Sequence, residues 1–142
     1  MSWTAVGAAL LAVLALAVTA NNRPEFGEEI KEIIRQIHNT CVDRTGAAEE
    51  DIANCENGIF KEDAKLKCYM SCLLEEATVI DTDEVVDYEF LVSMISEEWK
   101  ERFSKMIYAC RYLDTPDKDI CQRAFDVHKC AHGQDPELYY AF

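Results

Sequence analysis

The sequence predicts an all-α fold: a compact domain of six helices held together by disulfides. Three observations predict it. Apolar residues recur at intervals of three and four along most of the chain, which is the period of a helix with one buried face. No stretch alternates apolar and polar residues as a half-buried strand does. Seven cysteines are spread through a chain of 142 residues that opens with a secretion-type segment, and such a set is typical of a disulfide framework.

The opening segment is predicted to be a signal peptide, residues 1–20. Its run TAVGAALLAVLALAVTA carries no charge and ends in Val18-Thr19-Ala20, with small residues one and three places before a cut after Ala20. The alternative is a membrane anchor, since about 20 apolar residues can span a bilayer. The Ala-rich composition and the cleavage-type ending favour removal. Residues 21–142 are then a single secreted domain, because no Pro-, Gly- or Ser-rich linker divides them.

The charge of the chain narrows the classes of partner. The net charge is −13, and all of it falls in residues 21–142, because residues 1–20 hold no Asp, Glu, Lys or Arg. Nucleic acid and anionic membrane surfaces repel so acidic a protein. The sequence therefore predicts no nucleic-acid partner and a protein that stays soluble in an extracellular fluid.

The first three helices are predicted from apolar faces and boundary residues. The first carries a face of helical period, made of Phe26, Ile30, Ile33, Ile34, Ile37 and Cys41. The second is short, over residues 47–57, with Thr45 as its cap and Gly58 as its stop. The third runs from about Asp63 to Thr78, with an apolar face of Leu66, Met70, Leu73, Leu74 and Ala77.

A turn at residues 81–83 precedes the last three helices. The fourth is short and carries Phe90, Leu91, Met94 and Ile95. The fifth is long and amphipathic, with Trp99, Phe103, Met106, Ile107, Cys110 and Leu113 on its apolar face. Thr115 and Pro116 supply a cap and a first-turn proline for the sixth, from about Pro116 to His132, which Gly133 and Pro136 end.

Cys68 and Cys72 lie four residues apart on one helix face, which allows a metal site, a redox pair or two cross-links to neighbouring elements. A secreted chain favours cross-links. A bond between these two would join nothing, and Cys121 and Cys130 point about 180° apart at roughly 100° per residue. All four therefore need partners elsewhere. The residues leave the pairing open, since six cysteines allow 15 connectivities.

The histidines are the first place to look for chemistry. His128 and His132 lie one turn apart on the last predicted helix, near Asp126 and Asp135, and two such histidines bind zinc when further ligands arrive. No Glu stands between them in the metalloprotease arrangement, and Cys130 is expected to form a disulfide. We therefore predict no metal site, and two solvated histidines near a helix C-terminus.

An enzyme is not predicted. The stretch His128-Lys129-Cys130 superficially resembles the secreted phospholipases A2, but no Gly-rich loop accompanies it, because the glycines of residues 21–142 are scattered at 27, 46, 58 and 133. A G-x-S-x-G motif and a phosphate-cradling loop are also missing from the sequence. No cofactor is expected.

The cysteine spacing resembles a known family. The order Cys41, Cys68, Cys72, Cys110, Cys121 and Cys130, with its C-x3-C and C-x8-C intervals, resembles the six-cysteine signature of the insect odorant-binding proteins, also called pheromone-binding proteins. The stretch LKCYMSC, residues 66–72, is similar to the central motif of that family, and the resemblance covers essentially all of residues 21–142. It implies the pairing Cys41–Cys72, Cys68–Cys121 and Cys110–Cys130, each bridge worth roughly 3–4 kcal/mol.

Cys55 departs from that pattern, because it lies outside the six. Three states are open to it: a buried free thiol, an intermolecular bridge or a reactive surface site. A free cysteine on a short helix is most often buried, so we predict an unpaired, buried thiol.

The resemblance also implies an internal apolar cavity that binds small volatile or lipid-like molecules without catalysis. Cross-links let a small domain keep a cavity that would otherwise cost about 24 cal/mol per Å³, and flexible Met and aromatic side chains accept ligands of several shapes. The candidate ligand-binding residues are Leu74, Val79, Val86, Leu91, Met94, Phe103, Met106, Ile107, Ala124, Val127, Tyr139, Tyr140 and Phe142.

The C-terminal segment, residues 133–142, is predicted to be a lid over that cavity. It is too apolar for a free, solvated end, and in short-tailed relatives the corresponding segment lines the cavity wall. Its tyrosine hydroxyls are candidates to bond a ligand oxygen. We expect Asp135, Glu137 and the terminal carboxylate to hold the segment, so that acid loosens it.

The predicted function is a secreted carrier of odorants, pheromones or similar semiochemicals, moving through a fluid such as sensillum lymph and releasing its ligand near an olfactory receptor or a membrane. A monomer or weak homodimer is expected. Two alternatives stay open: the same fold as a scavenger of lipids or amines, and a secreted helical interaction protein with a solid core.

Overall fold

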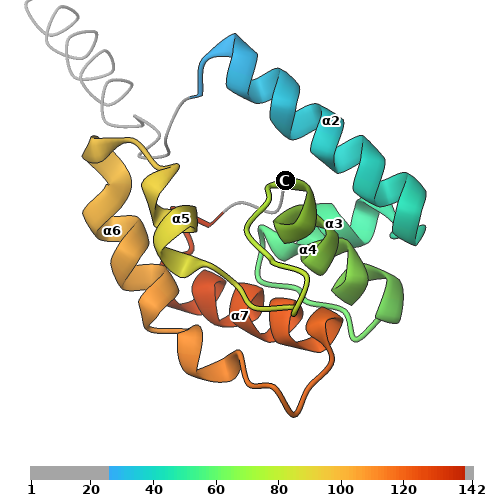
Figure 1. Ribbon diagram of the computed structural model, residues 1–142. Coiled ribbons are helices and arrows are strands. Elements are labelled where there is room, and N and C mark those ends of the chain that lie inside the picture. The colour runs from blue at the N-terminus through green and yellow to red at the C-terminus, as the bar shows by residue number, and fades with distance from the viewer. Residues whose placement is uncertain (1–25, 140–142) are drawn as a thin grey trace, which may run out of the picture.

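The computed structural model describes residues 26–139, which form six α-helices and one short 3-10 helix (Figure 1). The predicted all-α fold is confirmed. A single antiparallel bridge, between Ile80 and Val86, is the extended pairing in this part of the chain. The helices are α2 (Glu28–Thr45), α3 (Glu49–Cys55), α4 (Ala64–Glu76), α5 (Tyr88–Ser93), α6 (Glu97–Tyr108), η1 (Arg111–Leu113) and α7 (Ile120–Gln134).

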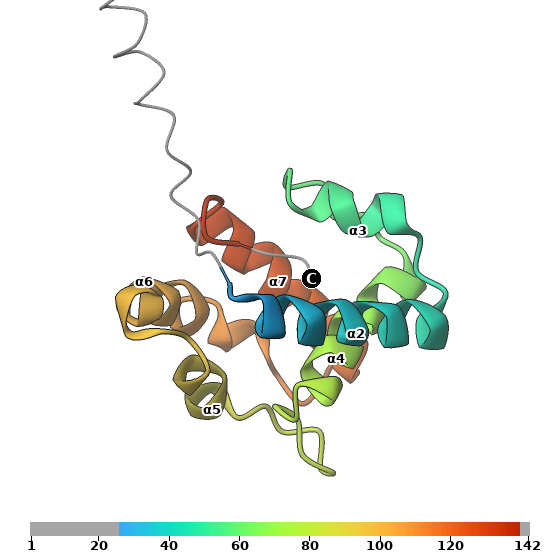
Figure 2. The ribbon, with the colours of Figure 1, turned by 90° about the horizontal axis from the view of Figure 1, so that it is seen from above.

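Helix α4 is the centre of the arrangement. It packs most extensively on α7 and next on α2, while α5 packs on α6 and α6 on α7. Figures 1 and 2 show the consequence: α2 and α4 lie on one side of the molecule, α5 and α6 lie on the other, and α7 passes along the base of both. The first half of α2 extends beyond α4 towards α6, so it spans the space between the two sides.

Three disulfides connect these helices. Cys41–Cys72 joins α2 to α4, Cys68–Cys121 joins α4 to α7, and Cys110–Cys130 joins the turn between α6 and η1 to α7, with Cα atoms 5.7, 4.4 and 5.6 Å apart. This is the pairing that the family resemblance implies. Two successive turns of α4 therefore hold two different neighbours, which explains the C-x3-C spacing.

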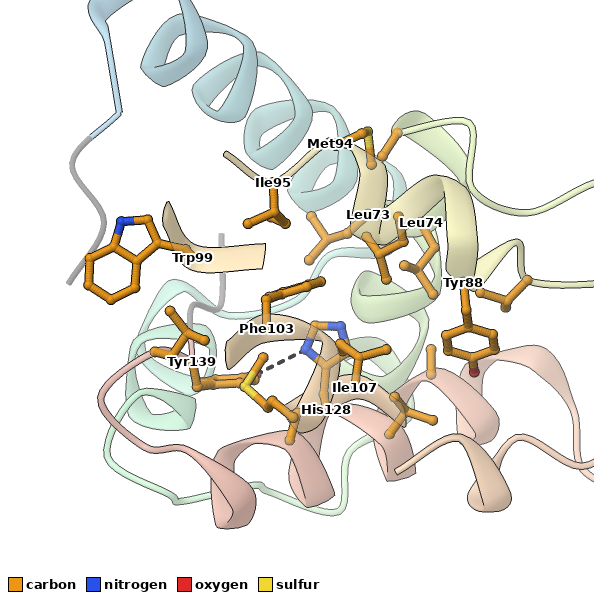
Figure 3. A pocket seen from close by; sticks show the side chains of 18 of the residues that line it. Leu73, Leu74, Tyr88, Met94, Ile95, Trp99, Phe103, Ile107, His128 and Tyr139 are labelled. Carbon is orange, nitrogen blue, oxygen red and sulfur yellow. Dashed lines mark hydrogen bonds between the residues drawn. The ribbon is translucent and has the colours of Figure 1, made fainter. Parts of the chain in front are cut away.

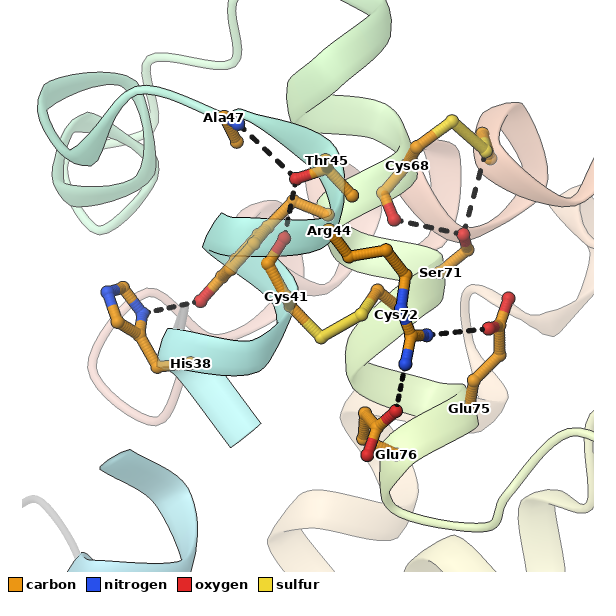
Figure 4. The surroundings of a disulfide bond; sticks show 12 residues. His38, Cys41, Arg44, Thr45, Ala47, Cys68, Ser71, Cys72, Glu75 and Glu76 are labelled. Atoms are coloured by element: carbon orange, nitrogen blue, oxygen red, sulfur yellow. Dashed lines mark hydrogen bonds and ion pairs between the residues drawn. A yellow bond between two sulfur atoms is a disulfide. The ribbon is translucent and has the colours of Figure 1, made fainter. Parts of the chain in front are cut away.

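Ion pairs reinforce the junction of α2 and α4. Arg44, in the last turn of α2, donates hydrogen bonds to the carboxylates of Glu75 and Glu76 at the end of α4, the first at 3.2 Å (Figure 4). Because all three side chains are substantially exposed, the disulfide beside them contributes far more to this junction than the pairs do.

Several predicted helix boundaries are wrong, among them the stop at Gly133, which lies inside the last helix instead of ending it. Thr45 does not cap the second helix: it is the last residue of α2, where its hydroxyl donates to the Cys41 carbonyl at 2.7 Å. The last helix begins at Ile120 instead of Pro116, because the Asp119 carboxylate accepts the Gln122 amide at 3.1 Å and caps it there. The fifth helix also ends early, at Tyr108, and the chain continues to Leu113 through the 3-10 turn.

The solid part of the core lies between α3, α4 and α7. Its fully buried side chains include Leu66, Tyr69, Met70, Phe125 and Cys55. The Cys55 thiol is unpaired and donates to the Asp51 carbonyl at 3.3 Å. Burial, together with the negative charge of Asp51, raises the pKa of Cys55 to about 11, so the thiol stays protonated and inert.

We expect Cys55 to resist alkylation in the native protein. Iodoacetamide at neutral pH should leave the oxidised, folded chain unmodified, and should add one equivalent once guanidinium exposes the thiol, because only the thiolate reacts. Mass spectrometry without reductant counts the adducts. Rapid labelling of the folded chain, or a dimer that reduction dissolves, would show instead that Cys55 is on the surface.

Gly58 and Gly133 form a matched pair for a stability test. Gly58 has φ +79°, and a Cβ there would lie 2.9 Å from Cε1 of His132, whereas a Cβ at Gly133, inside α7, meets nothing within 4 Å. Gly58→Ala should therefore destabilise the fold by about 1–3 kcal/mol, and Gly133→Ala should stabilise it by about 0.5–1 kcal/mol. Urea unfolding measures both. Equal midpoints for the two variants would contradict the close packing of His132 against this turn.

Candidate ligand-binding site

A cavity of about 880 Å³ lies between the two sides of the molecule. Helices α2, α4, α5, α6 and α7 all contribute to its wall, together with Leu138 and Tyr139 beyond the last helix (Figure 3). The wall is predominantly aliphatic and aromatic, and the volume falls within the roughly 300–1,000 Å³ that small-molecule sites occupy. The arrangement suits an apolar organic ligand.

The apolar face predicted for the first helix lines this cavity. Phe26, Ile30, Ile34 and Ile37 all contribute to the wall, yet Ile30 is 46% exposed, and Ile33, outside the wall, is 51% exposed. Cys41 is the buried residue of this face, so the prediction that the whole face is buried is wrong for the other residues. The disulfide at Cys41 fixes one end of α2, while the other half faces α5 and α6 across the open cavity.

Most of the predicted ligand-binding residues meet around the cavity. Those in its wall are Leu74, Val86, Leu91, Met94, Phe103, Met106, Ile107, Ala124, Val127 and Tyr139. Tyr140 and Phe142 lie outside the described residues. Phe90, predicted on the same short helix as Leu91 and Met94, is 41% exposed and does not line the cavity.

Val79 differs from that set, because it is buried away from the cavity wall. Thr78 adopts a left-handed conformation with φ 59° and reverses the chain after α4. The Val79 amide then donates to the Leu74 carbonyl at 2.9 Å, and its carbonyl accepts the Asp87 amide at 2.8 Å. Val79 thus stabilises the connection between α4 and α5 through its backbone hydrogen bonds.

His128 was not among the predicted ligand-binding residues, but it lines the cavity. Its Nδ1 lies 3.0 Å from the Tyr139 hydroxyl (Figure 3), and the two rings meet edge to face. Burial lowers the pKa of His128 to about 4, so the ring is neutral at pH 7. A signal was present in the sequence, because His128 lies four residues after Ala124, on the face predicted to line the cavity.

The expectation that His128 and His132 are solvated is wrong for both. Nε2 of His132 donates to the Glu56 carbonyl at 3.1 Å, and its ring packs edge-on against Phe60 and Tyr139. In residues 26–139, no group of three His, Cys, Asp or Glu side chains is placed to hold a metal ion.

Arg102 of α6 binds the chain that follows α7. Its guanidinium donates two hydrogen bonds to the Asp135 carboxylate, at 2.5 and 2.7 Å, and a third to Glu137 at 3.2 Å. A planar guanidinium matched to a carboxylate in this way fixes geometry as well as charge. Leu138 and Tyr139 follow at once, each 3% exposed, and complete the wall beside α7.

The wall also contains the ion pair of Asp114 and Arg123, whose charged groups bond to each other. The Asp114 carboxylate accepts hydrogen bonds from Arg123 Nε and from the Tyr88 hydroxyl, both at 2.6 Å, and Arg123 also donates to the Glu84 carbonyl at 2.8 Å. Burial and the bond to Asp114 raise the pKa of Tyr88. Because the charges are paired with each other, the cluster joins α5 and α7 without presenting a net charge to the cavity.

The depressed pKa of His128 predicts a pH-dependent stability. The unfolded chain binds a proton on this ring below its ordinary pKa of about 6.5, whereas the folded chain binds it only below about 4. Stability is therefore complete above the unfolded value and is lost as pH falls through this window, by about 2–3 kcal/mol at pH 4.5. Urea unfolding of the wild type and of His128→Gln, at pH 7.5 and 4.5, measures the difference. Parallel losses in the two proteins would contradict a buried, neutral ring.

The comparisons with known proteins agree on one family. The model of the PBP/GOBP family matches residues 24–134. General odorant-binding protein 69a of Drosophila melanogaster is 25% identical over 121 residues, which are 84% of this chain and 80% of that protein.

Solved structures share the fold. Odorant binding protein 5 of Apis mellifera matches with a TM-score of 0.72 at 18% identity, over 82% of this chain and 97% of that one. Odorant binding protein 7 from Anopheles gambiae, with four disulfide bridges and in complex with an azo compound, matches with a TM-score of 0.67 at 25% identity, over 77% and 88%.

The membrane-anchor alternative concerned residues 4–20, which lie outside the described residues. Over residues 26–139, no helix is both long enough and apolar enough to cross a bilayer.

Proposed function

The chain belongs to the PBP/GOBP family of insect odorant-binding proteins, and from this premise we propose that it carries small hydrophobic molecules, odorants, pheromones or similar compounds, in the cavity between its helices. Members of this family are carriers without enzymatic activity. The observation that carries the proposal is the cavity of about 880 Å³, whose wall is supplied by five helices and is mainly apolar. An interaction protein that acts through its surface is expected to have a packed core instead of such a cavity.

The mechanism is sequestration. An apolar molecule leaves water and is enclosed by aliphatic and aromatic side chains, which stabilises it by roughly 25 cal/mol per Å² of apolar surface removed from water. A ligand of about 15 non-hydrogen atoms, at roughly 0.4–0.5 kcal/mol per atom, binds with a Kd in the micromolar range. Affinity of this order allows both uptake and release.

The site of action follows from the cross-links and the charge. Three disulfides form and persist in an oxidising compartment, and removal of residues 1–20 as a signal peptide delivers the chain to one. A net charge of −13 keeps the carrier soluble in a fluid such as sensillum lymph. Release near an olfactory receptor or a membrane completes the cycle, with the protein acting as a monomer or weak homodimer.

The C-terminal residues, 133–142, serve in this proposal as the lid. Support comes from the hold of Arg102 on Asp135 and Glu137 and from the burial of Leu138 and Tyr139. Protonation of the two carboxylates removes these ion pairs, so acid loosens the lid.

Uptake of a fluorescent apolar probe tests the proposed function. We expect oxidised residues 21–142 to bind N-phenylnaphthylamine and to release it to competing apolar ligands at micromolar concentration. Leu91→Trp, which places a larger side chain in the wall, should weaken uptake roughly tenfold, since misfit in a packed site costs about 1–3 kcal/mol. Ile59→Trp is the matched control, because Ile59 is 58% exposed and away from the cavity.

The outcome separates the candidate functions. No uptake by a folded, correctly bridged protein would favour an interaction protein acting through its surface. Uptake with an expression pattern confined to saliva, haemolymph or reproductive fluid would favour the scavenger of lipids or amines. Loss in Leu91→Trp but not in Ile59→Trp places the ligand in the cavity.

A further inference from the structure

We propose that the Nε2–H of His128 is a hydrogen-bond donor directed into the cavity, and that it selects apolar ligands bearing a carbonyl oxygen, namely ketones, aldehydes and esters. This inference rests on the proposed carrier function and specifies the ligand class of the same site. The donor is the imidazole of α7, whereas the sequence suggested the hydroxyls of the C-terminal tyrosines.

The position of the ring is the first step. His128 shares a face of α7 with Ala124, Val127 and Ala131, and all four line the cavity. Figure 3 shows the imidazole among side chains of α6, Phe103 and Ile107, which line the same space. A polar ring in this apolar surrounding is where a ligand's polar group gains most from a bond.

The partner of Nδ1 determines which nitrogen carries the proton. Within residues 26–139, the Tyr139 hydroxyl has Nδ1 of His128 as its hydrogen-bond partner, at 3.0 Å, and no other acceptor. If Nδ1 carried the hydrogen, the phenol O–H of a side chain only 3% exposed would have nowhere to donate, which is costly for a buried group. The network therefore assigns the Tyr139 O–H as donor to Nδ1, and a neutral ring with one proton carries it on Nε2.

The remaining question is where Nε2–H points. No acceptor for it lies in the described part of the chain, yet every fully enclosed side-chain nitrogen and oxygen there has a partner. Nε2 is therefore not enclosed by protein. Because the ring is half-buried and lines the cavity, the space open to Nε2 is the cavity itself.

Other polar groups of the wall, Ser96, Glu98 and Trp99, come from the start of α6. Beside the imidazole the wall is formed by Phe103 and Ile107, and there the donor distinguishes ligands by their hydrogen-bonding groups. A carbonyl oxygen accepts the bond and leaves nothing unsatisfied. An alcohol oxygen also accepts it, but its own O–H then needs an acceptor among apolar side chains. An ammonium group brings only donors towards a donor, a carboxylate must carry its charge into the cavity, and a hydrocarbon leaves Nε2–H without a partner.

The Tyr88–Asp114–Arg123 cluster does not duplicate this donor. Its groups bond to one another and to the Glu84 carbonyl, and Figure 3 shows Tyr88 at the opposite end of the cavity from Tyr139. A ligand whose carbonyl lies at His128 therefore extends its apolar part towards α4 and α5.

Nitrogen-15 NMR of the imidazole tests the assignment without any ligand. In the oxidised protein at pH 7, we expect the His128 shifts to show a protonated Nε2 and an unprotonated Nδ1. The reverse pattern, or a charged ring, would overturn the inference and leave the carrier function intact.

Probe displacement tests the selectivity, with decanone, methyl nonanoate, decanol, decylamine and decane against bound N-phenylnaphthylamine. His128→Leu should weaken the binding of the ketone and the ester roughly three- to tenfold, which is the range for one neutral hydrogen bond. The affinity for decane should not change. Equal changes for the ketone and for decane would overturn the inference alone. Displacement by none of them would overturn the carrier function, and this inference with it.

Tyr139→Phe provides an independent variant, should His128→Leu not fold. Removing the phenol frees Nδ1, so the ring can place its proton there and offer Nε2 as an acceptor. We expect the affinity for decanol, relative to that for decanone, to rise roughly threefold or more. Tyr112→Phe, at a side chain 72% exposed, is the matched control, and an unchanged preference in Tyr139→Phe would show that Tyr139 does not set the tautomer.

Discussion

The structure depends on two covalent bonds made from successive turns of one helix. Cys68 attaches α4 to α7, and Cys72 attaches it to α2. These bonds fix the helices relative to each other whether or not side chains fill the space between them. At about 24 cal/mol per Å³, an empty void of 880 Å³ would cost roughly 20 kcal/mol, more than the 5–15 kcal/mol by which a domain is stable. A cavity of this size is therefore maintained by the cross-links and occupied by water or by a ligand.

The interior therefore consists of a packed part and a cavity, one on each side of α4. Between α3, α4 and α7 the packing is solid, around Tyr69, Met70 and Phe125. On the other side of α4, the same helix turns Leu73 and Leu74 to the cavity. Apart from the exposed Glu98, the charged groups of the cavity wall are paired with each other and His128 is neutral, so most of the acidity of the chain lies on its outer surface.

The helices were predictable because they depend on local period, which a sequence displays directly. The pairing of the cysteines was not predictable from the residues alone, and the resemblance to a known family implied it. The helix boundaries were less predictable. Thr115 and Asp119 both belong to the residue types that cap helices, and only the fold shows that Asp119 is used. The apolar stripe of α2 is evident, but period does not tell whether such a stripe meets a packed core or a cavity. The place of Val79 depends on the chain reversing after α4, and a reversal leaves little trace in residue type, whereas His128 lies on a helix face that the sequence displays.

The attachment of α2 separates two properties that most small domains keep in the same residues. Its last turns carry Cys41 and Arg44 and secure the fold, whereas Ile30 and Ile34 near its beginning shape the cavity and carry little of the packing. A substitution in the first half therefore alters what the protein recognises at small cost in stability. In a lineage of such carriers, this half-helix is where the range of ligands can diverge while the scaffold is inherited unchanged.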